Sequence, residues 1–330
     1  MIIVSKCPYR ISLLGGGSDL DWYLKRNNTG YSIGYSLDLH SYTVVQKMSN
    51  TSEFGILNYS SREYYSSIDD ITHPLIHWGL KTFSQETPLN ITTYGHASGG
   101  SGLGGSSSFL ISLLAALATL NGQSLTPSDL AKMAADIEID KLKKPVGRQD
   151  QYLCASGGVN AYRYNPNGTC EGVEMSQMKV DMLNEMISNF VLVPTGVTRD
   201  ASAVLESIKN QDDSVNHIHE ISKYAREFLY SADVSLSSMK HNFNGLVKDA
   251  WIAKKAMKDT LSSPILQDLS TIIESMPIYW HRLLGAGNGG YFLVYPKKSC
   301  CEFIEDLRSR GINSAIAAPI SQESVKTFII

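Results

Sequence analysis

Residues 99–108 of this chain read Gly99-Gly100-Ser101-Gly102-Leu103-Gly104-Gly105-Ser106-Ser107-Ser108. The segment 90–94 before them is typical of a strand, and leucines at helical spacing follow them from residue 110 to residue 120. Glycines allow the backbone to approach a ligand closely, and the free N–H groups and dipole at a helix start attract anions. The order strand, glycine turn, helix therefore predicts a phosphate-binding loop. The residues assigned to this loop are Gly100, Ser101, Gly102, Leu103, Gly104, Gly105, Ser106 and Ser107.

Two common phosphate-binding patterns do not describe this loop. No Gly-Lys-Ser/Thr follows the glycines, so the Walker pattern is absent, and the cluster lies far from the first strand, where the dinucleotide fingerprint is usual. The hydroxyls of Ser106 and Ser107 are candidates to bind phosphate or a metal ion. Two further glycine clusters stand at 15–17 and 285–290, so the 26 glycines of the chain are not scattered.

Length and composition set the class of protein. At roughly 100–200 residues per domain, 330 residues suggest two domains or one large one. The chain is 43% hydrophobic and 18% charged with a formal net charge of −3, which is typical of a globular protein and not of a disordered one. Binding to nucleic acid or to an anionic membrane would need a strong basic excess, so we expect neither partner.

The cysteines and the apolar segments bear on the compartment. Five cysteines, an odd number without a Cys-x-x-Cys pair, argue against a disulfide framework and a zinc site. The longest mainly apolar stretch, 109–120, is shorter than the ~20 residues that a membrane-spanning helix needs. Residues 1–6 do not resemble a secretory signal. We therefore expect a cytoplasmic enzyme or binding protein.

The expected secondary structure changes along the chain. Thr126 and Pro127 read as the N-cap and first residue of a helix that Pro145 should end. Strands dominate the early part, helices the later part, and strands return near the end. This order favours an α+β fold, with one domain over 1–188 and a second over 189–330. Strands are expected over 41–48, 90–94, 190–194 and 290–295, and helical periodicity over about 200–281.

Four charged residues are candidates for phosphoryl-transfer chemistry. Such a site needs a carboxylate to hold a divalent cation and a group to accept the proton of the attacking hydroxyl, and Glu138 and Asp150 can divide these tasks. Arg10 can offset phosphoryl charge, and Asp19 can accept hydrogen bonds from polyol hydroxyls. Taken alone, such acids are more often solvated surface residues, and Arg10 with Asp19 is more often a surface ion pair.

Three motifs together resemble the GHMP small-molecule kinases. They are Pro-Tyr-Arg-Ile-Ser-Leu-Leu-Gly-Gly-Gly-Ser-Asp over 8–19, the glycine loop over 99–108, and Leu-Leu-Gly-Ala-Gly-Asn-Gly-Gly-Tyr over 283–291. They occur in family order, and the resemblance covers essentially the whole chain. Within the superfamily, the segments 137–152 and 195–201 and the form of the first motif are similar to the D-glycero-D-manno-heptose 7-phosphate kinases.

The resemblance implies a fold, a reaction and a site. The fold would combine an N-terminal domain like the second domain of ribosomal protein S5 with a ferredoxin-like C-terminal domain. The reaction would phosphorylate O1 of the heptose 7-phosphate with ATP and Mg²⁺, for nucleotide-activated heptose and surface polysaccharide. Asp150 would be the catalytic acid near the sugar hydroxyl, Arg10 would lie beside the transferring phosphoryl group, and Glu138 with Ser106 or Ser107 would hold Mg²⁺. The substrate residues would include Gly16, Gly17, Ser18, Asp19, Gly287 and Arg199.

Several alternatives stay open. Gly105 stands where the family has its first loop serine, so the metal-binding hydroxyl can be that of Ser106 or of Ser107. A non-phosphorylated sugar such as fucose, galactose, mannose or an amino sugar is the alternative substrate, and an inactive sugar-sensing regulator is the alternative class. Basic candidates for the far phosphate of a sugar phosphate are Arg199, Lys6 and Arg148. A homodimer is possible.

Overall fold

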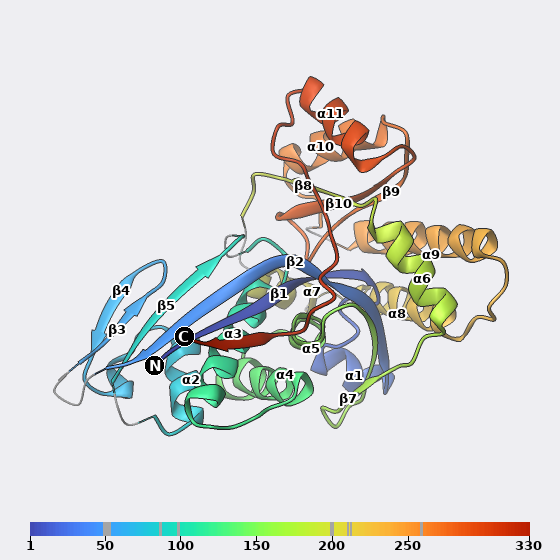
Figure 1. Ribbon diagram of the computed structural model, residues 1–330. Helices are drawn as coiled ribbons and strands as arrows, with labels where there is room; N and C mark the ends of the chain where they lie inside the picture. The colour runs from blue at the N-terminus through green and yellow to red at the C-terminus, as the bar shows by residue number, and fades with distance from the viewer. Residues whose placement is uncertain are drawn as a thin grey trace.

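The computed structural model describes residues 1–48, 54–85, 88–97, 100–198, 201–209, 211, 213–257 and 260–330. Within these residues the chain forms a sheet of eight strands and a second sheet of four, flanked by helices (Figure 1). The larger sheet contains β1 (Ile2–Leu14), β2 (Gly30–Lys47), β3 (Gly55–Asn58), β4 (Arg62–Tyr65), β5 (Leu89–Gly95), β6 (Val159–Tyr164), β7 (Cys170–Gly172) and β12 (Lys326–Ile329). The smaller sheet contains β8 (Val191–Pro194), β9 (Ile278–Leu283), β10 (Tyr291–Pro296) and β11 (Ile316–Ala317).

The helices follow the strands in an irregular order, which is the mark of an α+β fold, and this expectation is confirmed. A short 3₁₀ turn and a π-helical turn complete the regular structure. The helices are α1 (Asp21–Asn27), α2 (Pro74–Thr82), α3 (Gly105–Leu120), α4 (Pro127–Ala135), α5 (Gln149–Ser156), α6 (Gln177–Ile187), α7 (Ala201–Lys209), α8 (Ser214–Tyr230), α9 (Leu236–Ala256), α10 (Pro264–Glu274) and α11 (Cys300–Ser309), with the 3₁₀ turn η1 (Ile68–Asp70) and the π-helical turn η2 (Asp136–Lys141).

The 18-residue strand β2 organises the larger sheet. It pairs with β1 along its length, with β5 over residues 41–47 and with β6 over residues 30–35. The β1–β2 register shifts between Pro8 and Tyr9, where proline has no N–H to donate to the ladder. Arg10 follows this irregularity directly, and its own N–H donates to the carbonyl of Leu103 at 3.0 Å. The strand thereby makes a backbone contact with the glycine loop.

Helix α3 packs against β1 and β2 and forms the centre of the core. Its leucines Leu110, Leu113, Leu114 and Leu117 are all fully buried, which explains their helical spacing in the sequence. The helix begins directly after Gly104, so the glycine loop lies at its N-terminus. The predicted order of strand, glycine turn and helix is confirmed.

The smaller sheet has a different core on each face. Val191 and Val193 point to one face, where they pack with residues of α10 and α11, and Leu192 between them points to the core that the larger sheet shares. Figure 1 shows α10 and α11 above this sheet, away from the larger one. The strand β8 therefore joins two cores.

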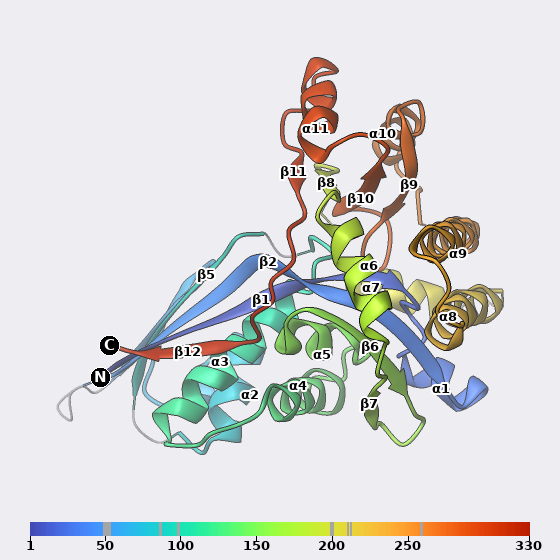
Figure 2. The ribbon, with the colours of Figure 1, turned by 45° about the vertical axis from the view of Figure 1, so that its right-hand side comes forward.

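The C-terminal strand returns to the larger sheet. β12 pairs antiparallel with β1 from Ile3–Ile329 to Lys6–Lys326. The two chain termini lie side by side in Figure 2. The division of the chain into domains at residue 188 stays a prediction, and residues 326–329 lie in the sheet that the N-terminal residues build.

Two sequence-based expectations on helices need correction. Helical periodicity was expected from about residue 200 to residue 281, but Ile278–Leu283 is the strand β9, paired with β10. Pro277 stops the preceding helix, and the β-branched and aromatic residues after it favour a strand. The helix at Thr126 begins as predicted, with Thr126 as its cap, but changes to the π-helical turn η2 at Asp136 and ends before Pro145.

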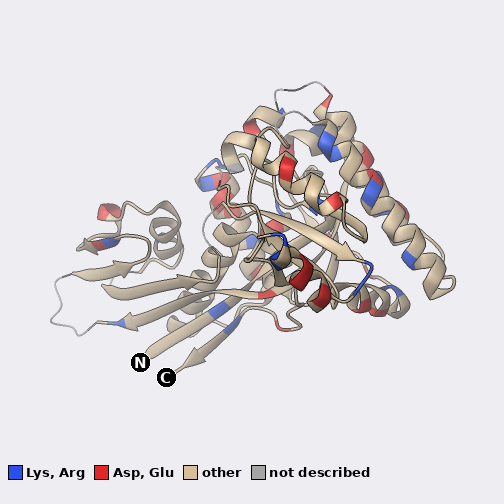
Figure 3. Cartoon of the chain, turned by 90° about the horizontal axis from the view of Figure 1, so that it is seen from above, with Lys and Arg blue, Asp and Glu red and all other residues tan. Residues whose placement is uncertain are grey.

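Acidic and basic residues are mixed along the helices, as the colouring of the ribbon in Figure 3 shows. This agrees with the formal net charge of −3. Among the described helices, none is both long enough and apolar enough to cross a membrane. All five cysteines carry free thiols.

The buried histidine of β9 should make stability depend on pH. Burial lowers the pKa of His281 to about 4, although Glu274 opposes this shift. The unfolded chain takes up the proton near pH 6.5, so the folded state loses about 3 kcal/mol of stability as the pH falls from about 6.5 to 4. Denaturant unfolding of the wild type and of His281→Gln across this range should show a shallower pH slope in the variant. An unchanged slope would assign the effect to other groups.

Candidate functional site

A cavity of about 440 Å³ opens where β1, the glycine loop, α5, α8 and β9 meet. Its size falls in the range of small-molecule sites. Of the residues that the sequence singled out, the following line it: Arg10, Gly16, Gly17, Asp19, Gly100, Ser101, Gly102, Gly104, Gly105, Ser106, Ser107, Glu138 and Asp150. One cavity thus collects side chains from positions far apart in the chain.

Three of the described candidates, Ser18, Leu103 and Gly287, do not line this cavity. Ser18 is fully buried, where its Oγ lies 2.8 Å from the carbonyl oxygen of Gly15 and accepts a hydrogen bond from the N–H of Tyr31. Leu103 is also fully buried, and Gly287 packs near Thr260. Both Ser18 and Leu103 therefore act on the shape of the loops that carry them. Arg199 lies outside the described residues.

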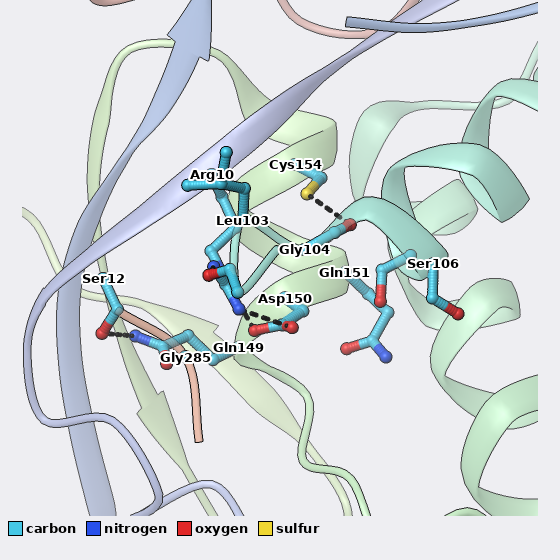
Figure 4. A network of polar contacts seen from close by, with 12 residues as sticks. Arg10, Ser12, Leu103, Gly104, Ser106, Gln149, Asp150, Gln151, Cys154 and Gly285 are labelled. Carbon is cyan, nitrogen blue, oxygen red and sulfur yellow. Dashed lines mark hydrogen bonds and ion pairs between the residues drawn. The ribbon is translucent and has the colours of Figure 1, made fainter. Parts of the chain in front are cut away.

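Arg10 and Asp150 form a two-point ion pair at the centre of the site. Arg10 Nε donates to Asp150 Oδ1 at 2.8 Å, and Nη2 donates to Oδ2 at 2.7 Å (Figure 4). The third guanidinium nitrogen, Nη1, donates to the carbonyl of Gly102 at 2.6 Å. Burial lowers the pKa of Arg10, but attraction to Asp150 outweighs it, and the net shift is upward. The pair fixes a carboxylate, 37% exposed, toward the cavity.

Asp19 holds the start of α5. Its Oδ2 accepts a hydrogen bond from the N–H of Gln149 at 2.8 Å, and the Gln149 side chain donates to Ser12 Oγ at 2.9 Å. Burial raises the pKa of the Asp19 carboxyl, while the Gln149 hydrogen bond opposes this shift. Asp19 therefore lies beside Asp150 and also positions the helix turn that carries it.

Glu138 accepts hydrogen bonds on both carboxylate oxygens. Ser106 Oγ donates to Oε1 and Ser107 Oγ to Oε2, each at 2.7 Å. Lys144 Nζ lies 2.9 Å from Oε1, and Gln151 Nε2 donates to Oε2 at 2.8 Å. The carboxylate is 2% exposed and stands on the π-helical turn η2, a type of local widening often found at functional sites.

This cluster fits a magnesium ion that also binds phosphate. Within the described residues there is no group of three or more His, Cys, Asp or Glu side chains that could hold a metal. Mg²⁺ often takes only one or two protein carboxylates and completes its shell with water and substrate phosphate oxygens. Glu138 and the hydroxyls of Ser106 and Ser107 match that donor set. Both hydroxyls contact the carboxylate equally, so the contacts do not select one serine.

The third glycine cluster packs directly on the glycine loop at the start of α3. A Cβ atom added to Gly290, whose φ is +94°, would lie 2.2 Å from the carbonyl oxygen of Ser101. Gly104, at φ +75°, is similarly closed by the Arg10 side chain, 2.9 Å from where its Cβ would stand. Only glycine allows these approaches. The smaller sheet thus contacts the loop through its backbone.

Sequence reasoning missed several lining residues. Gln149 directly precedes Asp150, and Lys144 lies six residues after Glu138, so proximity along the chain was the available signal. An apolar wall from α7 and α8 carries no such signal, because its residues look like ordinary core positions in the sequence. Its members are Leu205, Ile208, Ile218 and Ile221.

Comparisons with known proteins bear on the whole chain. Residues 74–158 match the GHMP kinases N-terminal domain. Over 315 residues the chain is 27% identical to the D-glycero-alpha-D-manno-heptose 7-phosphate kinase of Campylobacter jejuni, covering 90% of each protein. It is 23% identical to a bifunctional fucokinase/GDP-fucose pyrophosphorylase of Arabidopsis thaliana, covering 92% of this chain and 30% of that protein.

A solved structure shares the fold. It is a D-glycero-D-manno-heptose 1-phosphate kinase from Bacteroides thetaiotaomicron, which superposes with a TM-score of 0.76 at 21% identity over 99% of both chains. At that identity the likeness concerns the fold. The α+β architecture with two sheets is therefore shared along the full length.

The contact between Gly290 and the loop can be tested by substitution. Gly290→Ala should lower the free energy of unfolding by about 2 kcal/mol or more, because it combines a positive φ with a clash against backbone. Gly245→Ala is the matched control in α9, where an added Cβ meets nothing within 4 Å and should raise stability by about 0.5–1 kcal/mol. Denaturant unfolding measures both. Equal stability of the two variants would show that the loop moves away freely.

Proposed function

We propose that this chain is a GHMP kinase, a phosphotransferase with an alcohol acceptor, and that it transfers the γ-phosphoryl group of ATP to O1 of D-glycero-D-manno-heptose 7-phosphate. The observation that carries the proposal is the position and orientation of the Asp150 carboxylate. Its carboxylate faces the cavity, held by Arg10, beside the glycine loop at the start of α3. A proton acceptor and a phosphate cradle therefore adjoin one cavity, as phosphoryl transfer requires.

The proposed mechanism assigns one task to each group. The N–H groups at the start of α3 bind the phosphates, because the first turn of a helix leaves its donors without intrahelical partners. Asp150 accepts the proton of the sugar hydroxyl while the oxygen of that hydroxyl forms a bond to the γ-phosphorus. The bond to the β-phosphate breaks, and ADP leaves. Arg10 keeps the carboxylate aimed at that hydroxyl and lies beside the charge that develops.

Mg²⁺ is part of the proposal. Glu138 would hold it together with Ser106 or Ser107, and the ion would neutralise charge on the phosphate oxygens. Lys144 already compensates Glu138 at 2.9 Å, so a cation at this place competes with or displaces the ammonium group. A cytoplasmic location is also proposed, since five free thiols suit a reducing compartment.

The heptose 7-phosphate substrate rests on the sequence relative. The kinase of Campylobacter jejuni that carries this name matches 90% of this chain, a broad likeness at 27% identity. With this substrate, the phosphorylated heptose that the enzyme forms supplies nucleotide-activated heptose for surface polysaccharide. The second candidate is a non-phosphorylated sugar, favoured by the fucokinase relative and its 92% coverage of this chain. A sugar-sensing regulator without activity is less well supported, because Arg10, Asp150 and Glu138 stand together in the cavity.

Asp150→Asn tests the proton acceptor. The amide keeps the shape and can still accept a hydrogen bond from Arg10, but it cannot take a proton. We expect kcat to fall by at least ~10²-fold while nucleotide still binds. Steady-state kinetics and nucleotide titration measure the two effects separately.

Asp21→Asn provides the matched control. It breaks another aspartate–arginine pair, with Arg148, and Asp21 does not line the cavity. Its kcat should stay within about twofold of the wild type, since neither Asp21 nor Arg148 lines the cavity. Near-normal turnover of Asp150→Asn would remove Asp150 from the catalytic role.

A coupled ADP-release assay across sugars tests the substrate. Heptose 7-phosphate should give a kcat/KM well above those of hexoses, fucose and the unphosphorylated heptose. Comparable values on simple sugars would replace the proposed substrate with the second candidate. No turnover with any sugar, together with sugar-dependent binding to a protein, would support the regulator.

A further inference from the structure

Arg282 is a buried cation that lines the cavity from β9. It is 4% exposed, and its position in the strand lies opposite Leu293 of β10. Its Nη1 donates to the carbonyl of Leu13, at the end of β1 before the first glycine cluster. Its Nε is fully buried and has no hydrogen-bond partner within the described residues. The guanidinium thus has an unsatisfied donor in the cavity wall.

Arg282 also lacks a counter-charge. Asp19 and Asp150 line the same cavity, yet no described carboxylate lies within ion-pair distance of Arg282. Burial lowers its pKa to about 10, and repulsion from Arg10 adds to this shift, so it stays protonated near neutral pH. A buried charge without a partner is costly unless a ligand completes it.

The other cations of the cavity are already engaged. All three nitrogens of the Arg10 guanidinium donate to Asp150 or to Gly102. Lys144 contacts Glu138, and Lys254 donates to backbone carbonyls at 2.9 and 2.6 Å. Arg282 is therefore the lining cation, among the described residues, that has a buried donor without a partner.

The sequence-based candidates for a distal phosphate are held elsewhere. Lys6 pairs with Glu323 at 2.7 Å, and Arg148 pairs with Asp21. Neither lines the cavity, and Arg199 lies outside the described residues. A phosphorylated ligand in the cavity would meet Arg282 instead.

We infer that Arg282 binds a phosphate group of a ligand in the cavity, with its guanidinium fork directed at phosphate oxygens. The chemistry suits the residue, since a planar fork matches phosphate geometry. The inference rests on the proposed function for its ligands, because that reaction brings two phosphates to the cavity. One is the phosphate that the sugar carries, and the other is the phosphoryl group in transfer.

Binding measurements on the full chain separate these sources. Arg282→Gln is titrated with inorganic phosphate, with the magnesium complex of a non-hydrolysable ATP analogue, with heptose 7-phosphate and with the unphosphorylated heptose. A charge-assisted hydrogen bond lost from a buried site corresponds to about a 10- to 100-fold weaker affinity. The unphosphorylated heptose should bind as it does to the wild type.

The pattern of loss identifies the phosphate. A raised KM for heptose 7-phosphate with unchanged affinity for the nucleotide analogue assigns Arg282 to the phosphate of the sugar. A lowered kcat and weaker analogue binding with unchanged sugar affinity assigns it to the phosphoryl group in transfer. Either pattern supports the inference, and Arg282→Lys should recover part of the loss because it restores the charge without the fork.

Lys179→Gln controls for loss of a buried cation. Lys179 is 4% exposed, donates to the carbonyls of Leu229 and Ser231, and does not line the cavity. The Lys179→Gln variant should have a lower free energy of unfolding than the wild type and unchanged affinity for every ligand. If Arg282→Gln behaves in the same way, Arg282 only ties β9 to β1 and the inference is overturned.

The failure of the inference can be distinguished from the failure of the proposed substrate. If the wild type acts on an unphosphorylated sugar, yet Arg282→Gln loses affinity for inorganic phosphate or the nucleotide analogue, the substrate is wrong and the inference stands. If the wild type acts on heptose 7-phosphate and Arg282→Gln matches it in every titration, the inference alone fails.

Discussion

One arginine joins the three segments on which the site depends. The backbone N–H of Arg10 donates to Leu103, its Nη1 donates to Gly102, and its remaining nitrogens hold both oxygens of Asp150. The side chain is 5% exposed, so these charge-assisted contacts act in a medium with little water, where electrostatic interactions are stronger. Strand β1, the glycine loop and helix α5 are thereby held in one relative position, and the carboxylate keeps a fixed direction toward the cavity.

A second set of contacts connects the smaller sheet to this centre. Gly290 approaches the carbonyl of Ser101 so closely that no side chain fits between them, and Arg282 reaches from β9 to the carbonyl of Leu13. The cavity walls therefore come from both sheets, although most of the polar side chains that line the cavity stand on β1, the glycine loop, α3, η2 and α5. Two ion pairs stand within the cavity, Arg10 with Asp150 and Lys144 with Glu138, whereas no described carboxylate lies within ion-pair distance of Arg282.

Local sequence patterns predicted the elements whose cause is local. The glycines before a leucine-rich stretch predicted the loop and α3, and Thr126 with Pro127 predicted the start of α4, where the cap and the capping box are present. The segment 278–283 was misjudged because its strand character depends on pairing with β10, about ten residues later. Periodicity over a short apolar segment does not distinguish the two states, and tertiary pairing decides between them.

The sequence by itself determined which chemical groups are present: a glycine loop at a helix start, three acids, an arginine, and the motifs whose resemblance to a kinase family assigned them roles. Only the tertiary structure decided which of these groups meet. Ion pairing and burial are long-range in sequence, so Lys6 and Arg148 could not be separated from Arg282 by composition or spacing. The three cations differ in their surroundings. Lys6 and Arg148 each lie beside a carboxylate that neutralises them, whereas the buried guanidinium of Arg282 has a donor without a partner and can receive an anion.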